Sequence, residues 1–202
     1  MWVVKLGGSW ITNSKLGILI KLLSNFSDVP LIVVVGGGIF VDAIRSAQKH
    51  IPFDDDLAHD LAVEATQFYA KIIKNVNPNI NLITDFKKTP SKVALNVLLA
   101  RDFLKKYLGV EKKWDSTSDS IACWVSKKIN AKGVLFIKSI KVSENLAVSF
   151  QELQKEGILD KNVLNYISKE KNYKIVGPEI VNLLSSQKTW SKVLEKILDI
   201  KT

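Results

Sequence analysis

Short apolar runs alternate along this chain with longer stretches in which apolar residues recur every three or four positions. Continuous runs rich in Val, Ile and Leu occupy residues 2–6, 30–35, 133–137 and 173–176, and shorter apolar segments lie at 81–84 and 92–97. Continuous runs of this kind are typical of strands that are buried on both faces of a parallel sheet. The pattern therefore predicts a central sheet that is covered by helices on both sides.

Apolar residues at helical spacing fill the segments between these runs. They predict helices over residues 14–26, 39–50 and 54–76, a helix that begins at Thr117, Ser118 or Asp119, and two terminal helices at 178–186 and 191–200. The alternation of strand and helix predicts an α/β fold, a three-layer αβα sandwich with a mostly parallel central sheet. A chain of 202 residues is expected to form a single domain over residues 1–202.

The formal net charge of the chain is +9, which raises the question of an anionic partner. Only two of the cationic residues are arginines, Arg45 and Arg101, and the lysines are spread along the whole sequence. Basic surfaces that bind nucleic acid usually cluster arginine with aromatic residues. The spread therefore favours a solvated surface, and no nucleic-acid partner is expected.

The location of the protein is constrained by apolar run length and cysteine content. No apolar run reaches the length that a helix needs to cross a bilayer, so no membrane partner is expected. Cys123 is the single cysteine, which excludes an internal disulfide and fits a reducing compartment. We therefore expect a cytoplasmic protein.

Glycine-rich turns follow the first two predicted strands. Gly7, Gly8 and Ser9 come after the strand at 2–6, and Gly36, Gly37 and Gly38 come after the strand at 30–35. Glycine lets backbone N–H groups turn inward and lets a phosphate approach the main chain, and a following helix adds a favourable dipole. Ordinary tight turns are the alternative. Two such turns on consecutive strands favour phosphate binding, although the P-loop and dinucleotide patterns are both absent.

Two lysines occupy positions where lysine is unusual. Lys5 and Lys138 lie near the carboxyl ends of the predicted strands at 2–6 and 133–137. A lysine in a buried strand needs an anionic partner, unless its side chain reaches solvent. Phosphoryl transfer requires positive groups that converge on the transferred phosphoryl group. Asp119 is either the cap of its helix or an anion that holds both ammonium groups.

The ordered motifs resemble those of a known family. The segments KLGGS at residue 5, VVVGGG at residue 33 and TSDSIA at residue 117, followed by the lysine-ended strand GVLFIK, resemble the amino acid kinase superfamily over about residues 1–140. Within the superfamily, the segments DDDLAHDLAVEATQFYA and WDSTSDSIACWVS are similar to the small archaeal kinases of methanofuran biosynthesis and to their relatives in one-carbon metabolism. Those kinases use ATP to phosphorylate an aminomethylfuran-methyl phosphate.

The resemblance implies a role for each matching position. Lys5, Asp119 and Lys138 would be catalytic, with Asp119 orienting the lysines. The ATP phosphates would be bound by Gly7, Gly8 and Ser9. The acceptor would be bound by Gly36, Gly37, Gly38, His59, Thr117 and Ser118. The acceptor half would cover about residues 1–115, and the nucleotide half about residues 116–202.

The implied activity is transfer of the ATP γ-phosphoryl group to a phosphate or carboxylate oxygen of a small phosphorylated acceptor. ATP is the implied co-substrate, with Mg²⁺ held mainly by phosphates and water, so that no protein metal site is expected. A homodimer or higher homo-oligomer is implied by the family. Isopentenyl phosphate or a nucleoside monophosphate remains an alternative acceptor. The wall formed by His59 and residues 86–110 would discriminate between acceptors, because an apolar wall suits a prenyl chain and a polar wall suits an amine-bearing ring.

Two departures from the family pattern leave a non-catalytic, ligand-binding role open. Many relatives carry an Asp-Gly pair after the lysine-ended strand, where this chain has KSIKVSENL from residue 138. Many also carry a Gly-Thr pair near the end, where this chain has QKTWSKVL from residue 187. Both differences fall on the nucleotide half and bear on ATP affinity.

Overall fold

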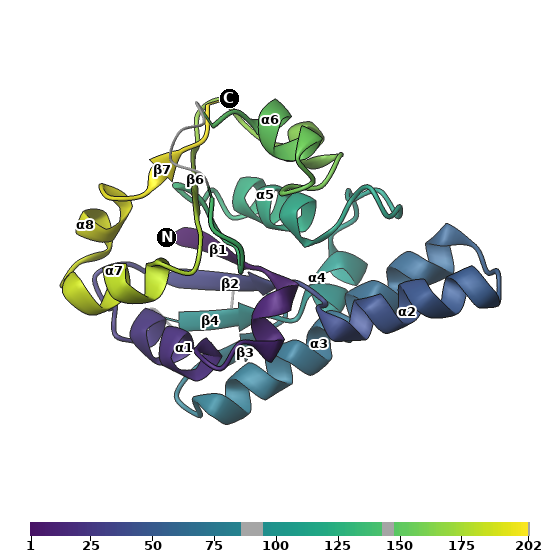
Figure 1. The fold of residues 1–202 in the computed structure, drawn as a ribbon, viewed down its shortest axis with the longest axis horizontal. Coiled ribbons are helices and arrows are strands. Elements are labelled where there is room, and N and C mark those ends of the chain that lie inside the picture. The colour runs from purple at the N-terminus through teal and green to yellow at the C-terminus, as the bar shows by residue number, and fades with distance from the viewer. Residues whose placement is uncertain (86–94, 143–147, 202) are drawn as a thin grey trace.

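A seven-stranded sheet forms the centre of the computed structural model, which describes residues 1–85, 95–142 and 148–201. Its order is β3-β4-β2-β1-β5-β6-β7 (Figure 1). All neighbouring strands pair in parallel except β6 and β7, which are antiparallel. The strands are β1 (Trp2–Leu6), β2 (Leu31–Val35), β3 (Asn81–Ile83), β4 (Leu95–Leu98), β5 (Gly133–Ile137), β6 (Asn172–Val176) and β7 (Leu198–Asp199).

Helices cover both faces of this sheet (Figure 1). Val4 and Leu6 of β1 belong to one apolar core with residues of α1, α7 and α8, while Val3 belongs to a second core with residues of α4, α5 and α6. The predicted three-layer α/β fold with a mostly parallel sheet is therefore confirmed. The helices are α1 (Leu16–Ser24), α2 (Ile39–His50), α3 (Asp55–Val76), α4 (Ala100–Lys106), α5 (Ser118–Lys128), α6 (Phe150–Lys155), α7 (Ile180–Ser186) and α8 (Trp190–Leu194), with short 3₁₀ helices η1 (Gly8–Thr12) and η3 (Val163–Tyr166).

The helices predicted at 39–50 and 54–76 agree closely with α2 and α3. At the start of α3, the Asp54 side chain accepts a hydrogen bond of 2.7 Å from the backbone N–H of Leu57. This is the usual reason why an aspartate precedes a helix. Helix α4 was not predicted, and residues 92–94 of the strand predicted at 92–97 lie outside the described residues.

The terminal helix predicted at 191–200 is wrong beyond Leu194. Ile197 packs in the first core and Ile200 in the second, on opposite faces of the sheet. Side chains three positions apart point to opposite faces in a strand but to one side of a helix. The segment therefore forms β7 along the edge of β6, and the backbone N–H of Ile200 donates to the carbonyl of Tyr173 at 2.8 Å.

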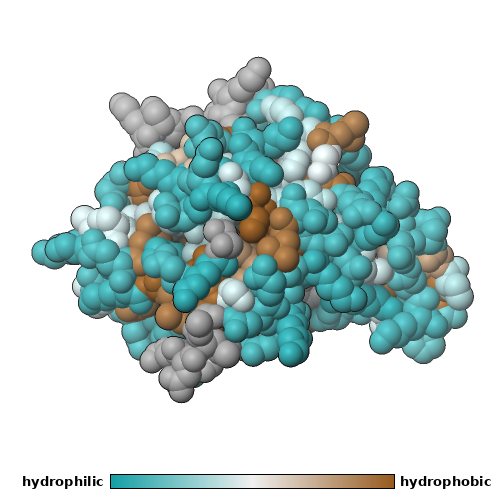
Figure 2. Space-filling model, turned by 90° about the horizontal axis from the view of Figure 1, so that it is seen from above, coloured by the Kyte–Doolittle hydropathy of each residue, from teal (hydrophilic) through white to brown (hydrophobic). Residues whose placement is uncertain are grey.

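The molecular surface is mostly hydrophilic on the face shown in Figure 2, with smaller hydrophobic patches between the polar residues. Among the helices of the described residues, none has the length and apolar character that crossing a bilayer requires.

Candidate active site

The alternation of side chains along two neighbouring strands brings Lys5 and Lys138 to the same face of the sheet. Lys5 lies two positions after Val3 in β1, and Lys138 lies two positions after Phe136 in β5. Val3 and Phe136 both pack in the core beneath α5. Because alternate residues of a strand share a face, both lysines point towards the first turn of α5. The two side chains are buried, with exposed fractions of 6% and 10%.

Asp119 in this first turn forms ion pairs with both lysines. Its Oδ1 atom lies 2.8 Å from Nζ of Lys5 and 2.9 Å from Nζ of Lys138, and its Oδ2 atom lies 3.0 Å from Nζ of Lys138. One carboxylate thus bridges two ammonium groups. The cluster carries a net charge of +1 when all three groups are ionised, so it attracts an anion at the carboxyl ends of β1 and β5.

Burial and the neighbouring charges shift the pKa values of Asp119 and Lys138. Burial acts to raise the pKa of Asp119, but Lys138 and Lys5 outweigh burial and hold it below its ordinary value. Burial is also the main reason why the pKa of Lys138 falls to about 8. Asp119 opposes this fall, and the charge of Lys5 adds to it. Lys138 therefore loses its proton at a lower pH than an exposed lysine does.

Asp160, which the sequence analysis did not identify, fixes the start of α5. Its carboxylate accepts hydrogen bonds from the backbone N–H groups of Thr117 and Ser120, both at 2.9 Å, and from their two hydroxyl groups. The backbone N–H of Asp160 in turn donates to Oδ2 of Asp119 at 3.2 Å. Thr117 is the N-cap residue by position, but the capping carboxylate comes from a residue 43 positions away. No local pattern signals such a partner.

The two glycine turns pack directly against each other. A Cβ atom on Gly8 would lie 2.3 Å from the backbone nitrogen of Gly38, and one on Gly36 would lie 2.6 Å from the backbone nitrogen of Gly8. Gly38 also has a φ of +55°, in the left-handed region that favours glycine. These glycines are therefore required for close approach of the two backbones, whatever ligand they bind.

The N–H groups of these turns are not all available to a ligand. Gly7 donates to the carbonyl of Ile137 at 2.9 Å, and Gly36 donates to the carbonyl of Leu6 at 2.9 Å, so both extend the sheet. Gly8 and Ser9 begin η1, and the first N–H groups of a helix have no partner within it. Gly8 and Ser9 are thus the donors that the first turn can offer to an anion.

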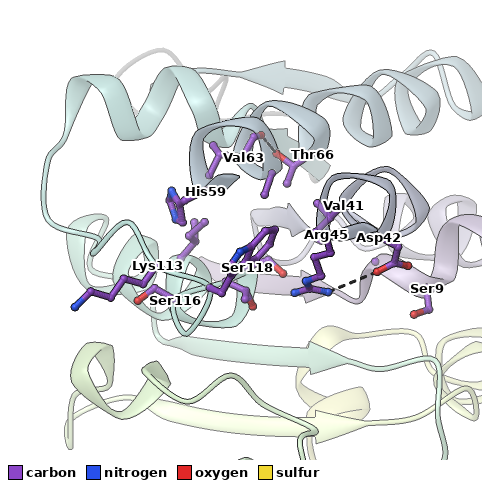
Figure 3. A pocket seen from close by; sticks show the side chains of 18 residues that line it. Ser9, Val41, Asp42, Arg45, His59, Val63, Thr66, Lys113, Ser116 and Ser118 are labelled. Atoms are coloured by element: carbon purple, nitrogen blue, oxygen red, sulfur yellow. Dashed lines mark hydrogen bonds and ion pairs between the residues drawn. The ribbon is translucent and has the colours of Figure 1, made fainter. Parts of the chain in front are cut away.

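Two cavities meet at these turns. The first, which we call the His59 cavity, has a volume of about 200 Å³ and extends from Gly36, Gly37 and Gly38 to His59 (Figure 3). The second, the lysine cavity, has a volume of about 490 Å³ and is lined by Lys5, Gly7, Asp119, Lys138 and Asp160. Five residues line both cavities: Gly8, Ser9, Arg45, Trp114 and Thr117. A group held at Gly8 and Ser9 is therefore accessible from both sides.

The His59 cavity holds the other residues expected at the acceptor. Thr117 and Ser118 line it at the start of α5, and His59 lies on α3 at the end far from Ser9 in Figure 3. His59 is buried, and neither of its ring nitrogens has a hydrogen-bond partner with good geometry among the described residues, although the backbone of Ser116 lies near the ring. Burial lowers the pKa of His59, with a smaller opposing effect from Asp60. The lowered pKa favours the neutral imidazole, which can donate one hydrogen bond and accept another.

One of the two family departures has a structural explanation. In QKTWSKVL, the Trp190 side chain is buried, its ring lies 5.6 Å from that of Phe26, and its backbone N–H donates to Asp28 at 2.9 Å. The segment anchors α8 to the core. The other departure, KSIKVSENL, falls partly on residues 143–146, which lie outside the described residues.

Comparison with solved structures relates this fold to kinases. The uridylate kinase from Archaeoglobus fulgidus superimposes with a TM-score of 0.64 at 18% identity, over 92% of this chain and 96% of that one. The aspartate kinase from Synechocystis gives 0.64 at 12% identity, over 87% of this chain and 37% of that one. At these identities the likeness concerns the fold.

Comparison of sequences gives a family. The [5-(aminomethyl)furan-3-yl]methyl phosphate kinase of Methanocaldococcus jannaschii is 24% identical over 145 residues. The match covers 69% of this chain and 66% of that relative, so the chain spans somewhat less than two thirds of it. The sequence pattern of the amino acid kinase family matches residues 1–142, which include both glycine turns, Lys5, Asp119 and Lys138. The chain belongs to the amino acid kinase family.

Proposed function

We propose that this protein is an ATP-dependent kinase that transfers the γ-phosphoryl group to an oxygen of a small phosphorylated acceptor. The observation that carries the proposal is the cluster of Lys5, Asp119 and Lys138 beside the junction of two cavities. Phosphoryl transfer needs little covalent chemistry from a protein and depends on positioning and on charge stabilisation. A buried cluster with excess positive charge supplies that stabilisation.

ATP is assigned to the lysine cavity and the acceptor to the His59 cavity. The γ-phosphate would then lie at the shared turn, within reach of the N–H groups of Gly8 and Ser9 and of the two lysines. Lys5 and Lys138 would neutralise charge on the transferred group, and Asp119 would keep both ammonium groups in place. An acceptor phosphate is already ionised, so the transfer requires no general base.

Mg²⁺ would arrive with the ATP phosphates as part of the substrate. Asp119 is engaged by two lysines and Asp160 caps α5. The third carboxylate that lines the lysine cavity, Asp115, is half-exposed and pairs with Lys161 at 3.4 Å. Within residues 1–85, 95–142 and 148–201, no cluster of three or more His, Cys, Asp or Glu side chains is placed to hold a metal ion. In the proposed reaction, phosphate and water oxygens would coordinate most of the ion.

[5-(Aminomethyl)furan-3-yl]methyl phosphate is our first candidate for the acceptor, from the function of the M. jannaschii relative. The wall of the His59 cavity supports a compact acceptor with hydrogen-bonding groups. Val41, Val63 and Ile121 provide apolar contact, and His59 and Thr66 provide polar groups. The wall expected from residues 86–110 is not part of this cavity in the described residues: Arg101, Leu104 and Tyr107 line a separate cavity on the other side of His59, and positions 86–94 lie outside the described residues. Isopentenyl phosphate and nucleoside monophosphates are the alternatives to be compared.

The test is ADP release with each acceptor by the wild type and by Lys5→Met. We expect turnover to fall on the order of 10²–10³-fold, the typical cost of one lost electrostatic contact to the transition state. Lys5→Met leaves Asp119 paired with Lys138, so the fold should be retained, which circular dichroism would check. Lys21→Ala, an exposed lysine on α1, is the matched control and should retain full activity.

Unchanged turnover in Lys5→Met would contradict the assigned site. Binding of a non-hydrolysable ATP analogue by a wild-type protein that turns over none of the acceptors would instead indicate a non-catalytic, ligand-binding member of the family.

A further inference from the structure

Arg45 is the positively charged residue that lines both cavities in the part of the chain that the structure describes. It lies on α2, one turn beyond Asp42, and its side chain extends into the His59 cavity (Figure 3). The other cations line one cavity each: Lys113 lines the His59 cavity, and Lys5, Lys138 and Lys161 line the lysine cavity. Arg45 is therefore placed to contact a group that lies between the two cavities.

The guanidinium group of Arg45 is supported by an aromatic ring. Its Cζ atom lies 4.7 Å from the ring centroid of Trp114. The indole N–H of Trp114 donates to the side-chain carbonyl of Gln48 at 2.7 Å, and the Gln48 amide donates to the carbonyl of Phe53 at 2.9 Å. The ring is thus fixed to the end of α2, and the cation–π contact restricts where the guanidinium group can lie.

The charge of Arg45 is only weakly compensated by the protein. Its ion pair with Asp42 has an N–O distance of 3.5 Å, and the two side chains are 47% and 69% exposed. Ion pairs between exposed side chains contribute little and are readily replaced. A planar guanidinium group can bind a phosphate through two parallel hydrogen bonds, and a lysine cannot reproduce this geometry. The arginine on its indole support is therefore suited to a phosphate.

We infer that Arg45, supported by Trp114, binds the phosphate group of the acceptor at the junction of the two cavities and so determines the specificity of the enzyme for phosphorylated acceptors. The inference rests on the proposed kinase function. Arg45 holds the acceptor phosphate from the α2 side, opposite the buried lysine cluster, and directs one of its oxygens towards the γ-phosphate at Gly8 and Ser9.

The first arm of the test measures binding without turnover. Methyl phosphate is titrated into the wild type, Arg45→Ala and Arg45→Lys, and the dissociation constant is followed by NMR of the indole N–H signals. Because a hydrogen-bonded charge pair is lost, we expect Arg45→Ala to weaken binding about 10- to 100-fold. Arg45→Lys should recover only a small part of the affinity. Lys128→Ala is the matched control, since Lys128 lies 5.5 Å from the ring centroid of Trp124 but lines neither cavity.

The second arm measures turnover with [5-(aminomethyl)furan-3-yl]methyl phosphate and ATP. We expect the KM of the acceptor to rise at least tenfold in Arg45→Ala while the KM of ATP stays within twofold. A rise in the KM of ATP alone would overturn the inference, as would methyl phosphate binding by Arg45→Ala within twofold of the wild type, or no binding by the wild type. Absence of wild-type turnover with every acceptor would count against the proposed function, and the titration would still decide the role of Arg45.

Discussion

Replacement of Asp119 by Asn tests the energetics of the buried cluster. The substitution keeps the size of the side chain but removes the charge that neutralises Lys5 and Lys138, whose residues are 5% and 8% exposed. Removing one partner of a buried ion pair costs about 3–5 kcal/mol, because the remaining charge is buried without compensation. Here two ammonium groups lose their carboxylate at once.

An upper limit follows from the chemistry of lysine. A buried ammonium group can escape its unfavourable environment by losing its proton. At pH 7 this costs about 1.4 kcal/mol for each unit between the pH and the ordinary lysine pKa of about 10.4, or about 4.6 kcal/mol for each lysine that becomes neutral. Loss of one proton also removes the repulsion between the two lysines, so we expect Asp119→Asn to lower the free energy of unfolding by about 3–4.6 kcal/mol at pH 7.

The assay is urea unfolding followed by circular dichroism at pH 7 and pH 9.5. In the folded variant a lysine is neutral, whereas in the unfolded chain it is protonated, so the folded state becomes relatively more stable as the pH rises. The loss of unfolding free energy caused by Asp119→Asn should therefore be smaller at pH 9.5 than at pH 7. Asp199→Asn is the matched control, because Asp199 pairs with Lys174 at 2.7 Å but is 73% exposed, and should cost less than about 1 kcal/mol. A loss below 1 kcal/mol for Asp119→Asn would refute the account of the cluster.

Three further predictions concern the same region. The pKa of Lys138 is about 8 in the folded protein and ordinarily 10.5, so between pH 8 and 10.5 the folded protein binds fewer protons than the unfolded chain. The free energy of unfolding of the wild type should therefore rise by about 3 kcal/mol over this range relative to that of Lys138→Met. Parallel pH profiles of the two proteins in urea unfolding would contradict this. Gly8→Ala should lower the melting temperature strongly, because its Cβ would lie 2.3 Å from the backbone nitrogen of Gly38; calorimetry that shows an unchanged melting temperature would rule out the close backbone packing. Asp160→Ala should lower the free energy of unfolding by about 2 kcal/mol or more, because the N–H groups at the start of α5 lose their acceptor. Asp160→Asn should lower it by less. Equal unfolding free energies for the wild type and Asp160→Ala would be inconsistent with the capping role.

The amino-acid sequence by itself determined the described strands other than β7 and most of the helices, because these depend on local periodicity. The bounds of α2 and the start of α3 follow from apolar spacing and from the capping position of Asp54. The positions of Lys5 and Lys138 at strand ends were also visible in the sequence. That both side chains share a face follows from alternation only together with the register of the structure, which pairs Lys5 with Phe136.

Only the tertiary structure decided which partners these residues meet. Asp160 caps α5 from 43 positions away, Arg45 lies on the ring of Trp114, and the last strand forms at the edge of β6. The choice of Asp119 as a bridge between two lysines was likewise one of two readings of the sequence. Such contacts depend on how helices and loops pack over the sheet, and local propensity carries no information about partners that packing brings together over long separations in the chain.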